Sequence, residues 1–169
     1  HGVTLDAGEG AYLDVWSGSS PAGRGIQIGS AMRGEVQIRP GSRIMGNYLD
    51  GILVNGGEDV QIDDVFVGAN SQAASGTYNG ITIGANVTGW KVRGCKSGDL
   101  PSGSNLQGYG LYVNSGCNHY IVTGNDFRDN VTGTMYVLDI GTSKVIKDNL
   151  PNTPQTRTGA GAVTLTEPL

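Results

Sequence analysis

The sequence predicts an all-β protein that coils as a right-handed, single-stranded parallel β-helix of about five rungs. Three segments begin with the same alternation, thirty residues apart: DVQIDDVFVG at 59–68, GWKVRGCKSG at 89–98 and HYIVTGNDFR at 119–128. A second element, a glycine followed by a strand-like triplet, recurs as GIQI at 25–28, GILV at 51–54, GITI at 80–83 and GLYV at 110–113. No helical pattern separates these elements, so each strand should pair with its equivalent in the next repeat.

The repeat aligns the apolar residues into four columns that face inward. Two columns are rich in Ile and Val, and a third contains the rings of Trp90 and Tyr120 and continues less regularly toward Lys144. Trp90 is expected to fill the core between Val60 and Tyr120. The columns are Ile26/Ile52/Ile81/Leu111/Met135, Ile28/Val54/Ile83/Val113/Val137, Val36/Val60/Trp90/Tyr120 and Ile38/Ile62/Val92/Val122/Ile146.

One position of the repeat changes from apolar to polar along the chain. Val65 aligns with Cys95, and then with Asn125 and Asn149. Asn side chains stacked inside a corner can satisfy the backbone groups of the turns, so a short ladder of Asn125 and Asn149 is expected. The 29 glycines among 169 residues fit the tight turns of each rung, because glycine readily adopts positive φ.

The repeat also divides the chain into regions. Residues 1–23 are expected to form lead-in or capping strands, residues 24–150 the β-helix, and residues 151–169 an extended linker toward a missing or separate C-terminal domain. The segment LPNTPQTRTG at 150–159 holds two of the six prolines and lacks alternation. Because a short stack exposes strand edges at both ends, the chain is expected to be a fragment of a longer protein.

Charge and motif content disfavour several classes of function. The formal net charge of −4 without a Lys/Arg cluster argues against nucleic-acid binding, and the lack of a long apolar run argues against membrane insertion. No P-loop, nucleophile elbow or complete dinucleotide motif is present, so no cofactor is expected. The two histidines and the two cysteines are too scattered for a metal site, and Cys95 and Cys117 differ in repeat position, which argues against a disulfide.

Several rungs resemble the β-helical part of bacteriophage tailspikes and tail fibres. The residues concerned are NGITIGANVTGWKVRGCKSG at 79–98 and YGLYVNSGCNHYIVTGNDFRDN at 109–130, followed by DNLP at 148–151 and TGAGAVTLTEPL at 158–169. The resemblance implies a homotrimer on the virion tail that contacts other phage tail proteins and binds, and often depolymerises, a bacterial surface polysaccharide. A non-catalytic trimeric rod is an alternative, as is a bacterial β-helical polysaccharide lyase or adhesin, because these proteins share the rung pattern.

A glycoside hydrolase would need two neighbouring carboxylates. The densest acidic cluster comprises Glu58, Asp59, Asp63 and Asp64, which are the catalytic candidates. Asp63 and Asp64 are expected at a corner where both can face solvent. The simpler interpretation is that these residues cap turns, with Arg93 one rung further on as an ion-pair partner of Asp63, and this interpretation is favoured.

A column of outward residues comprises Leu53, Thr82, Tyr112 and Tyr136. Aromatic rings in a line can pack against the apolar faces of sugars, or they can form a contact between subunits, which is the more common use in a trimer. Loops at 71–79 and 99–109 are long enough to build a groove beside the column. The substrate-binding candidates are Tyr78, Tyr109, Tyr112, Tyr136 and Arg93, with Trp16 as a further aromatic.

Overall fold

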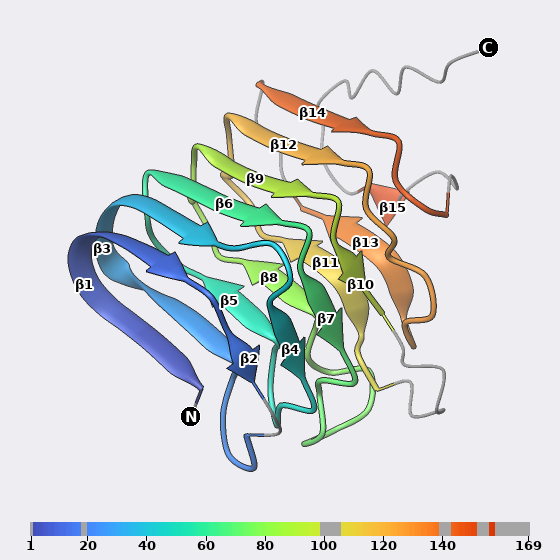
Figure 1. Ribbon diagram of the computed structural model, residues 1–169. Helices are drawn as coiled ribbons and strands as arrows, with labels where there is room; N and C mark the ends of the chain where they lie inside the picture. The colour runs from blue at the N-terminus through green and yellow to red at the C-terminus, as the bar shows by residue number, and fades with distance from the viewer. Residues whose placement is uncertain (1, 18–19, 99–105, 139–142, 152–155, 158–169) are drawn as a thin grey trace.

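The computed structural model describes residues 2–17, 20–98, 106–138, 143–151 and 156–157 (Figure 1). Within these residues the strands pair in parallel and no helix is present. The chain turns repeatedly about one axis and forms a β-solenoid of about five turns, which confirms the predicted coiled parallel architecture. Figure 1 shows the turns stacked from β1 at one end to β14 and β15 at the other.

Each turn of the solenoid has three sides. Side one consists of residues 3–5 of β1 (Val3–Leu13) and residues 26–28 of β3 (Ile26–Ile38), followed by β5 (Ile52–Val54), β8 (Ile81–Ile83), β11 (Tyr109–Val113), β13 (Gly133–Val137) and β15 (Thr156–Arg157). Side two consists of residues 10–13 of β1 and 35–38 of β3, followed by β6 (Asp59–Asp63), β9 (Trp90–Arg93), β12 (Tyr120–Thr123) and β14 (Lys144–Lys147). Side three consists of β2 (Trp16–Ser17), β4 (Arg43–Met45), β7 (Phe66–Gly68) and β10 (Lys96–Ser97).

The predicted inward columns are confirmed by the register of the strands. On side one, Ile52 pairs with Ile26 and Ile81, and the column continues through Leu111 to Met135. On side two, Ile62 pairs with Ile38 and Val92. All members of the four columns are buried, because successive strand residues point to opposite faces and the apolar ones all point inward.

The largest side chains of the core lie in the third column. Trp90 and Tyr120 are each 1% exposed, and their rings stack with centroids 4.2 Å apart and an interplanar angle of 6°. Val60 precedes Trp90 in the same register, as predicted. Trp90 Nε1 has no hydrogen-bond partner among the described residues, so the ring is held by packing alone.

The glycines that precede the strands of side one are required by close packing. A Cβ on Gly51 would lie 2.5 Å from Cγ1 of Val67 on side three, and a Cβ on Gly110 would lie 2.9 Å from Cβ of Phe127. Each is below the closest distance that real Cβ atoms tolerate. These recurring glycines therefore allow side three to pack into the corner, and this role differs from the positive φ expected from composition.

Positive φ recurs at other corners of the solenoid, both before and after side two. Asp64, Gly94, Gly124 and Asp148 occupy equivalent positions in successive turns and have φ of 51°, 62°, 66° and 55°. Glycine and aspartate tolerate this left-handed conformation better than most residues do. Asp64 is therefore at a corner, as predicted, and the backbone conformation explains why an aspartate is suited to it.

Two ladders of amide side chains line the corners. The predicted pair is present: Asn125 Nδ2 donates to Asn149 Oδ1 at 2.8 Å and the Asn125 backbone N–H donates to the same oxygen at 3.1 Å. A second, longer ladder was not predicted, and in it each amide donates to the next at 2.7–2.9 Å, in the order Asn47, Asn70, Gln107, Asn130. Both ladders satisfy buried polar groups where the chain turns.

The two cysteines are free and buried, which agrees with the expectation that they are not joined. The described residues contain no helix that could span a membrane.

Residues 152–155 and 158–169 of the predicted linker, and residues 99–105 of the second predicted loop, lie outside the described residues. The regional boundaries at 1–23, 24–150 and 151–169 remain predictions.

Candidate functional site

Three tyrosines gather on the outer surface of side one. Tyr112 and Tyr136 are register partners on β11 and β13, and Tyr109 begins β11. The ring centroids of Tyr112 and Tyr136 are 5.2 Å apart with an interplanar angle of 18°. The centroid of the Tyr109 ring lies 5.9 Å from that of Tyr112 and 5.3 Å from that of Tyr136. All three rings are half-buried, so a continuous aromatic surface remains accessible. We call these three residues the tyrosine cluster.

The outward register explains why the tyrosine cluster forms. The predicted column is confirmed by pairing, since Leu53 is the partner of Thr82, Thr82 of Tyr112, and Tyr112 of Tyr136. Parallel strands place equivalent residues about 4.8 Å apart, which is suitable for the stacking of neighbouring rings. Regular alternation would turn Tyr109 inward with Leu111, but the pattern is interrupted at Gly110, and the Tyr109 ring lies outside, beside the pair.

The neighbouring rings alter the ionisation of the central tyrosine. Partial burial raises the pKa of the Tyr112 phenol above its ordinary value, and the nearby hydroxyls of Tyr136 and Tyr109 raise the pKa further. The neutral phenol is therefore the stable form around neutral pH. A neutral aromatic surface is suited to packing against apolar groups of a ligand.

A hydrogen-bonded network adjoins the tyrosine cluster toward the N-terminal end of the solenoid. Asp50 accepts hydrogen bonds from Arg24 Nε at 3.0 Å and from the Thr82 hydroxyl at 2.8 Å. Asn79 Nδ2 donates to Thr82 Oγ1 at 3.1 Å, and Asn79 Oδ1 accepts from the backbone N–H of Tyr109. The Asp50 side chain is only 7% exposed, so the network is fixed in position and links the polar residues to the tyrosine cluster.

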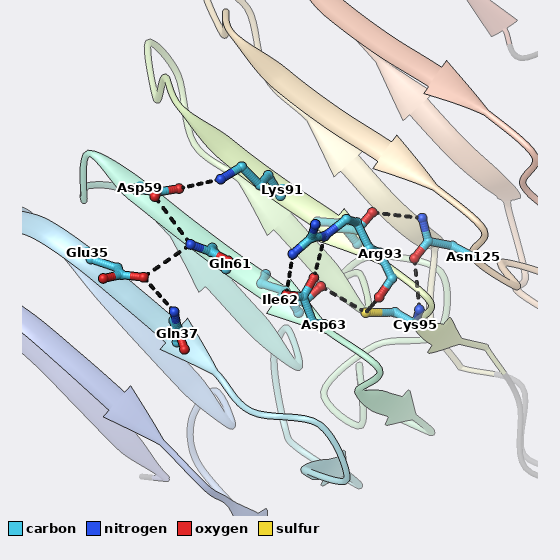
Figure 2. Close-up of polar contacts among 11 residues, drawn as sticks. Glu35, Gln37, Asp59, Gln61, Ile62, Asp63, Lys91, Arg93, Cys95 and Asn125 are labelled. Atoms are coloured by element: carbon cyan, nitrogen blue, oxygen red, sulfur yellow. Dashed lines mark hydrogen bonds and ion pairs between the residues drawn. The ribbon is translucent and has the colours of Figure 1, made fainter.

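The outer surface of side two has a different character, shown in Figure 2. Both oxygens of Asp63 accept hydrogen bonds from Arg93, at 2.8 and 2.6 Å. This contact raises the pKa of the Arg93 guanidinium, although partial burial acts in the opposite direction. The predicted ion pair between adjacent rungs is thus present, and both carboxylate oxygens of Asp63 have a partner.

A second carboxylate group lies nearer the N-terminal end of side two. Glu35 and Asp59 are register partners, and each accepts a hydrogen bond from Gln61 Nε2, at 3.1 and 3.2 Å (Figure 2). Because both accepting oxygens bond to the same nitrogen atom, the two carboxylates lie close together. Lys91 Nζ forms an ion pair with Asp59 at 3.0 Å.

The predicted catalytic candidates do not converge on one point. Asp59 and Asp63 are four residues apart on the extended strand β6, which separates their Cα atoms by about 13 Å. Carboxyl groups of glycosidases lie about 5–9.5 Å apart. Glu58 and Asp64 are exposed on either side of the strand. The pair that the structure brings together is Glu35 with Asp59, and Glu35 was not among the predicted residues.

The predicted binding residues fall into separate groups. Tyr109, Tyr112 and Tyr136 come together, whereas Arg93 lies on side two and is held by Asp63. Tyr78 belongs to the loop before β8 and is half-buried, and its carbonyl accepts a hydrogen bond from Gly108 N–H, next to Tyr109. Trp16 is 81% exposed on side three, where Arg43 lies 5.5 Å from its ring centroid.

No set of three His, Cys, Asp or Glu residues within the described parts of the chain is arranged to hold a metal ion. Asp126, which is the bridge partner of Lys96 in β10, is paired with Arg128 at 2.8 Å. The hydrogen bond from Arg128 lowers the pKa of the Asp126 carboxyl. Its carboxylate is thus engaged by a cationic side chain of the same turn.

The fold and the outer surfaces define the chain as a β-solenoid with one aromatic and one charged side. No protein-family model, curated protein or solved structure matches this chain. Its function is therefore argued from the geometry of the two sides.

Proposed function

We propose that this β-solenoid is a segment of a bacteriophage tailspike or tail fibre and binds a bacterial surface polysaccharide, such as capsule or O-antigen, during host attachment. The observation that carries the proposal is the tyrosine cluster, three adjoining rings that are half-buried on a regular sheet. Sugar rings present apolar C–H faces that pack on aromatic side chains, and hydroxyl groups that hydrogen-bond to polar neighbours such as Thr82 and Asn79. The solenoid keeps both kinds of group at fixed spacing.

Binding to purified capsular and O-antigen polysaccharides tests the proposal. Tyr112→Ala/Tyr136→Ala should weaken binding about tenfold, because each lost ring contact is worth about 0.5–1.5 kcal/mol. Tyr112→Phe/Tyr136→Phe keeps the rings and should retain most of the affinity. Equal binding by the alanine and phenylalanine variants would show that the rings do not contact the glycan.

We also propose that the chain acts as a homotrimer on the virion tail, in contact with other tail proteins. Support comes from the tyrosine cluster, whose adjoining and partly accessible rings a second copy of the chain could cover. A second use of the tyrosine cluster would then be a contact between subunits of a non-catalytic rod. Sedimentation equilibrium at micromolar concentration distinguishes the two uses. Dissociation of the trimer by Tyr112→Ala/Tyr136→Ala, without loss of glycan binding, would assign the tyrosine cluster to the subunit contact.

A further inference from the structure

One outward column of side one is uncharged throughout. From β3 to β13 it comprises Gln27, Leu53, Thr82, Tyr112 and Tyr136, and each residue is the register partner of the next. All five are half-buried. The column therefore forms a strip of polar and aromatic groups that runs along the solenoid axis, at about 4.8 Å per turn.

Two charged side chains border this strip, and each neutralises the other. Arg24 Nε lies 3.0 Å from Asp50 Oδ2, and Arg24 also donates to Gln27 Oε1 at 3.3 Å. Asp50 accepts further hydrogen bonds from Thr82 and from the Asn79 backbone. The two opposite charges cancel at this distance, and the Asp50 carboxylate is already hydrogen-bonded, so the pair presents no net charge to an ionised ligand.

We infer that the ligand of side one is an uncharged polysaccharide that lies along the solenoid axis, with sugar rings on the tyrosine cluster and hydroxyl groups beside Thr82 and Gln27. The inference rests on the proposed polysaccharide binding and adds the class and direction of the glycan. An anionic glycan would lose water from its carboxylates over this strip without gaining a cation in exchange. The hydroxyls of a neutral sugar lose far less on transfer to such a surface.

An array of purified bacterial polysaccharides, grouped by whether the repeat unit is charged, tests the class of ligand. The wild-type protein should retain uncharged polysaccharides, and retention should not change between ~50 and ~500 mM NaCl, because no ion pair is formed. The inference would be overturned if the protein retained anionic polysaccharides, with or without uncharged ones, and if this retention fell as salt was added. The proposed function would still stand. Retention of neither group would overturn the proposed function together with the inference.

The direction of the glycan is tested by a charge placed away from the tyrosine cluster. Leu53→Asp adds a carboxylate two turns before Tyr112 in the same column. A glycan along the axis would cover this position, and we expect about tenfold weaker retention of long polysaccharides. Ile121→Asp is the matched control, because Ile121 is also half-buried and outward but lies on side two.

The control should bind as the wild type does, and melting curves of both variants report whether they remain folded. Undiminished retention by folded Leu53→Asp would overturn the axial placement. If both variants weakened binding equally, the effect would come from the added charge wherever it lies on the surface, and the axial placement of the glycan would be overturned as well.

Discussion

Side one and side two share a core and a strand register but differ on their outer surfaces. On side one the outward residues are aromatic or neutral, and the tyrosine cluster stacks over two turns. On side two the outward residues of β6 and β9 include paired charges, as between Asp63 and Arg93, whereas Ile121 and Val145 on β12 and β14 are apolar. The backbone pairing is parallel on both sides, so the difference lies only in the outward side chains.

This difference indicates how a solenoid can separate stability from recognition. Inward residues are fixed by packing, whereas outward residues contact only their neighbours in adjacent turns. Ion pairs at the surface contribute little to stability because water screens them, and the partners satisfy each other. The charges of β6 and β9 on side two are therefore engaged with each other, and side one presents adjoining aromatic rings.

The largest expected effect concerns the core that both sides share. Trp90→Ala should lower the free energy of unfolding by about 3–5 kcal/mol, because Trp90 fills the column between Val60 and Tyr120 and its removal leaves a cavity. Chemical denaturation measures the change. Trp90→Phe should cost less, since it keeps a ring against Tyr120 and removes the unpaired Nε1. An unchanged denaturation curve for the alanine variant would contradict the core assignment.

The second prediction tests whether a dry core lies beneath the charged surface of side two. Burial raises the pKa of the Cys95 thiol well above its ordinary value, to about 12. At pH 8 the native thiolate fraction should be about a thousandfold below that of an unperturbed thiol, so Cys95 should resist thiol reagents until the protein unfolds. The raised pKa favours the neutral thiol in the folded state, so this contribution to stability is complete below about pH 9 and is lost as the pH rises through about 12.

Titration with a thiol reagent, with and without denaturant, measures this protection. Cys117→Ser isolates the signal of Cys95. Rapid labelling of the native protein at pH 8 would show that water reaches the core at this corner.

The third prediction concerns the carboxylate that borders side one. Asp50→Ala should cost about 1–3 kcal/mol of stability, because the buried carboxylate is lost and Arg24 and Thr82 lose their acceptor. Thermal or denaturant unfolding measures this cost. Asp50→Asn keeps an acceptor for Thr82 and should cost less. Equal stability of the alanine variant and the wild type would mean that the network does not hold the strip in place.

The smallest effect is expected at the corner of side two. Asp63→Asn/Asp64→Asn should change stability by no more than about 1 kcal/mol, because the Asp63 side chain is 24% exposed, that of Arg93 is 43% exposed, and the pair is screened. A reducing-end assay on the same variant tests the predicted catalytic assignment. Full depolymerase activity in the variant would eliminate Asp63 and Asp64 as catalytic residues, and Glu35→Gln/Asp59→Asn is the matched comparison.

Much of the fold could be predicted from the repeat. The apolar columns, the Asn125 and Asn149 ladder and the pair of Asp63 with Arg93 all follow from residues at equal repeat positions. The ladder that includes Asn70 and Gln107 could not be predicted from the repeat, because its members are separated by 23, 37 and 23 residues. Loops of unequal length interrupt the period, and only the folded chain restores the alignment.

The candidate site was predictable only in part. The column of Leu53, Thr82, Tyr112 and Tyr136 was found from alternation, whereas the meeting of Glu35 with Asp59 was not considered. A signal was present, since these acids immediately precede Val36 and Val60, which align in the inward column. A cluster of acids close together in sequence is not the pairing that a parallel solenoid favours, because the fold brings together residues one turn apart.

The sequence by itself determined which side chains face the core, because burial of apolar residues at period two leaves a single register for each strand. Only the tertiary structure decided which outward side chains meet. That outcome depends on the loops between strands and on the rotamers that neighbours allow, and neither leaves a periodic mark on the sequence. For this reason the core could be assigned residue by residue, while the contact of Tyr109 with Tyr112 and Tyr136 and the meeting of Glu35 with Asp59 became clear only in the folded solenoid.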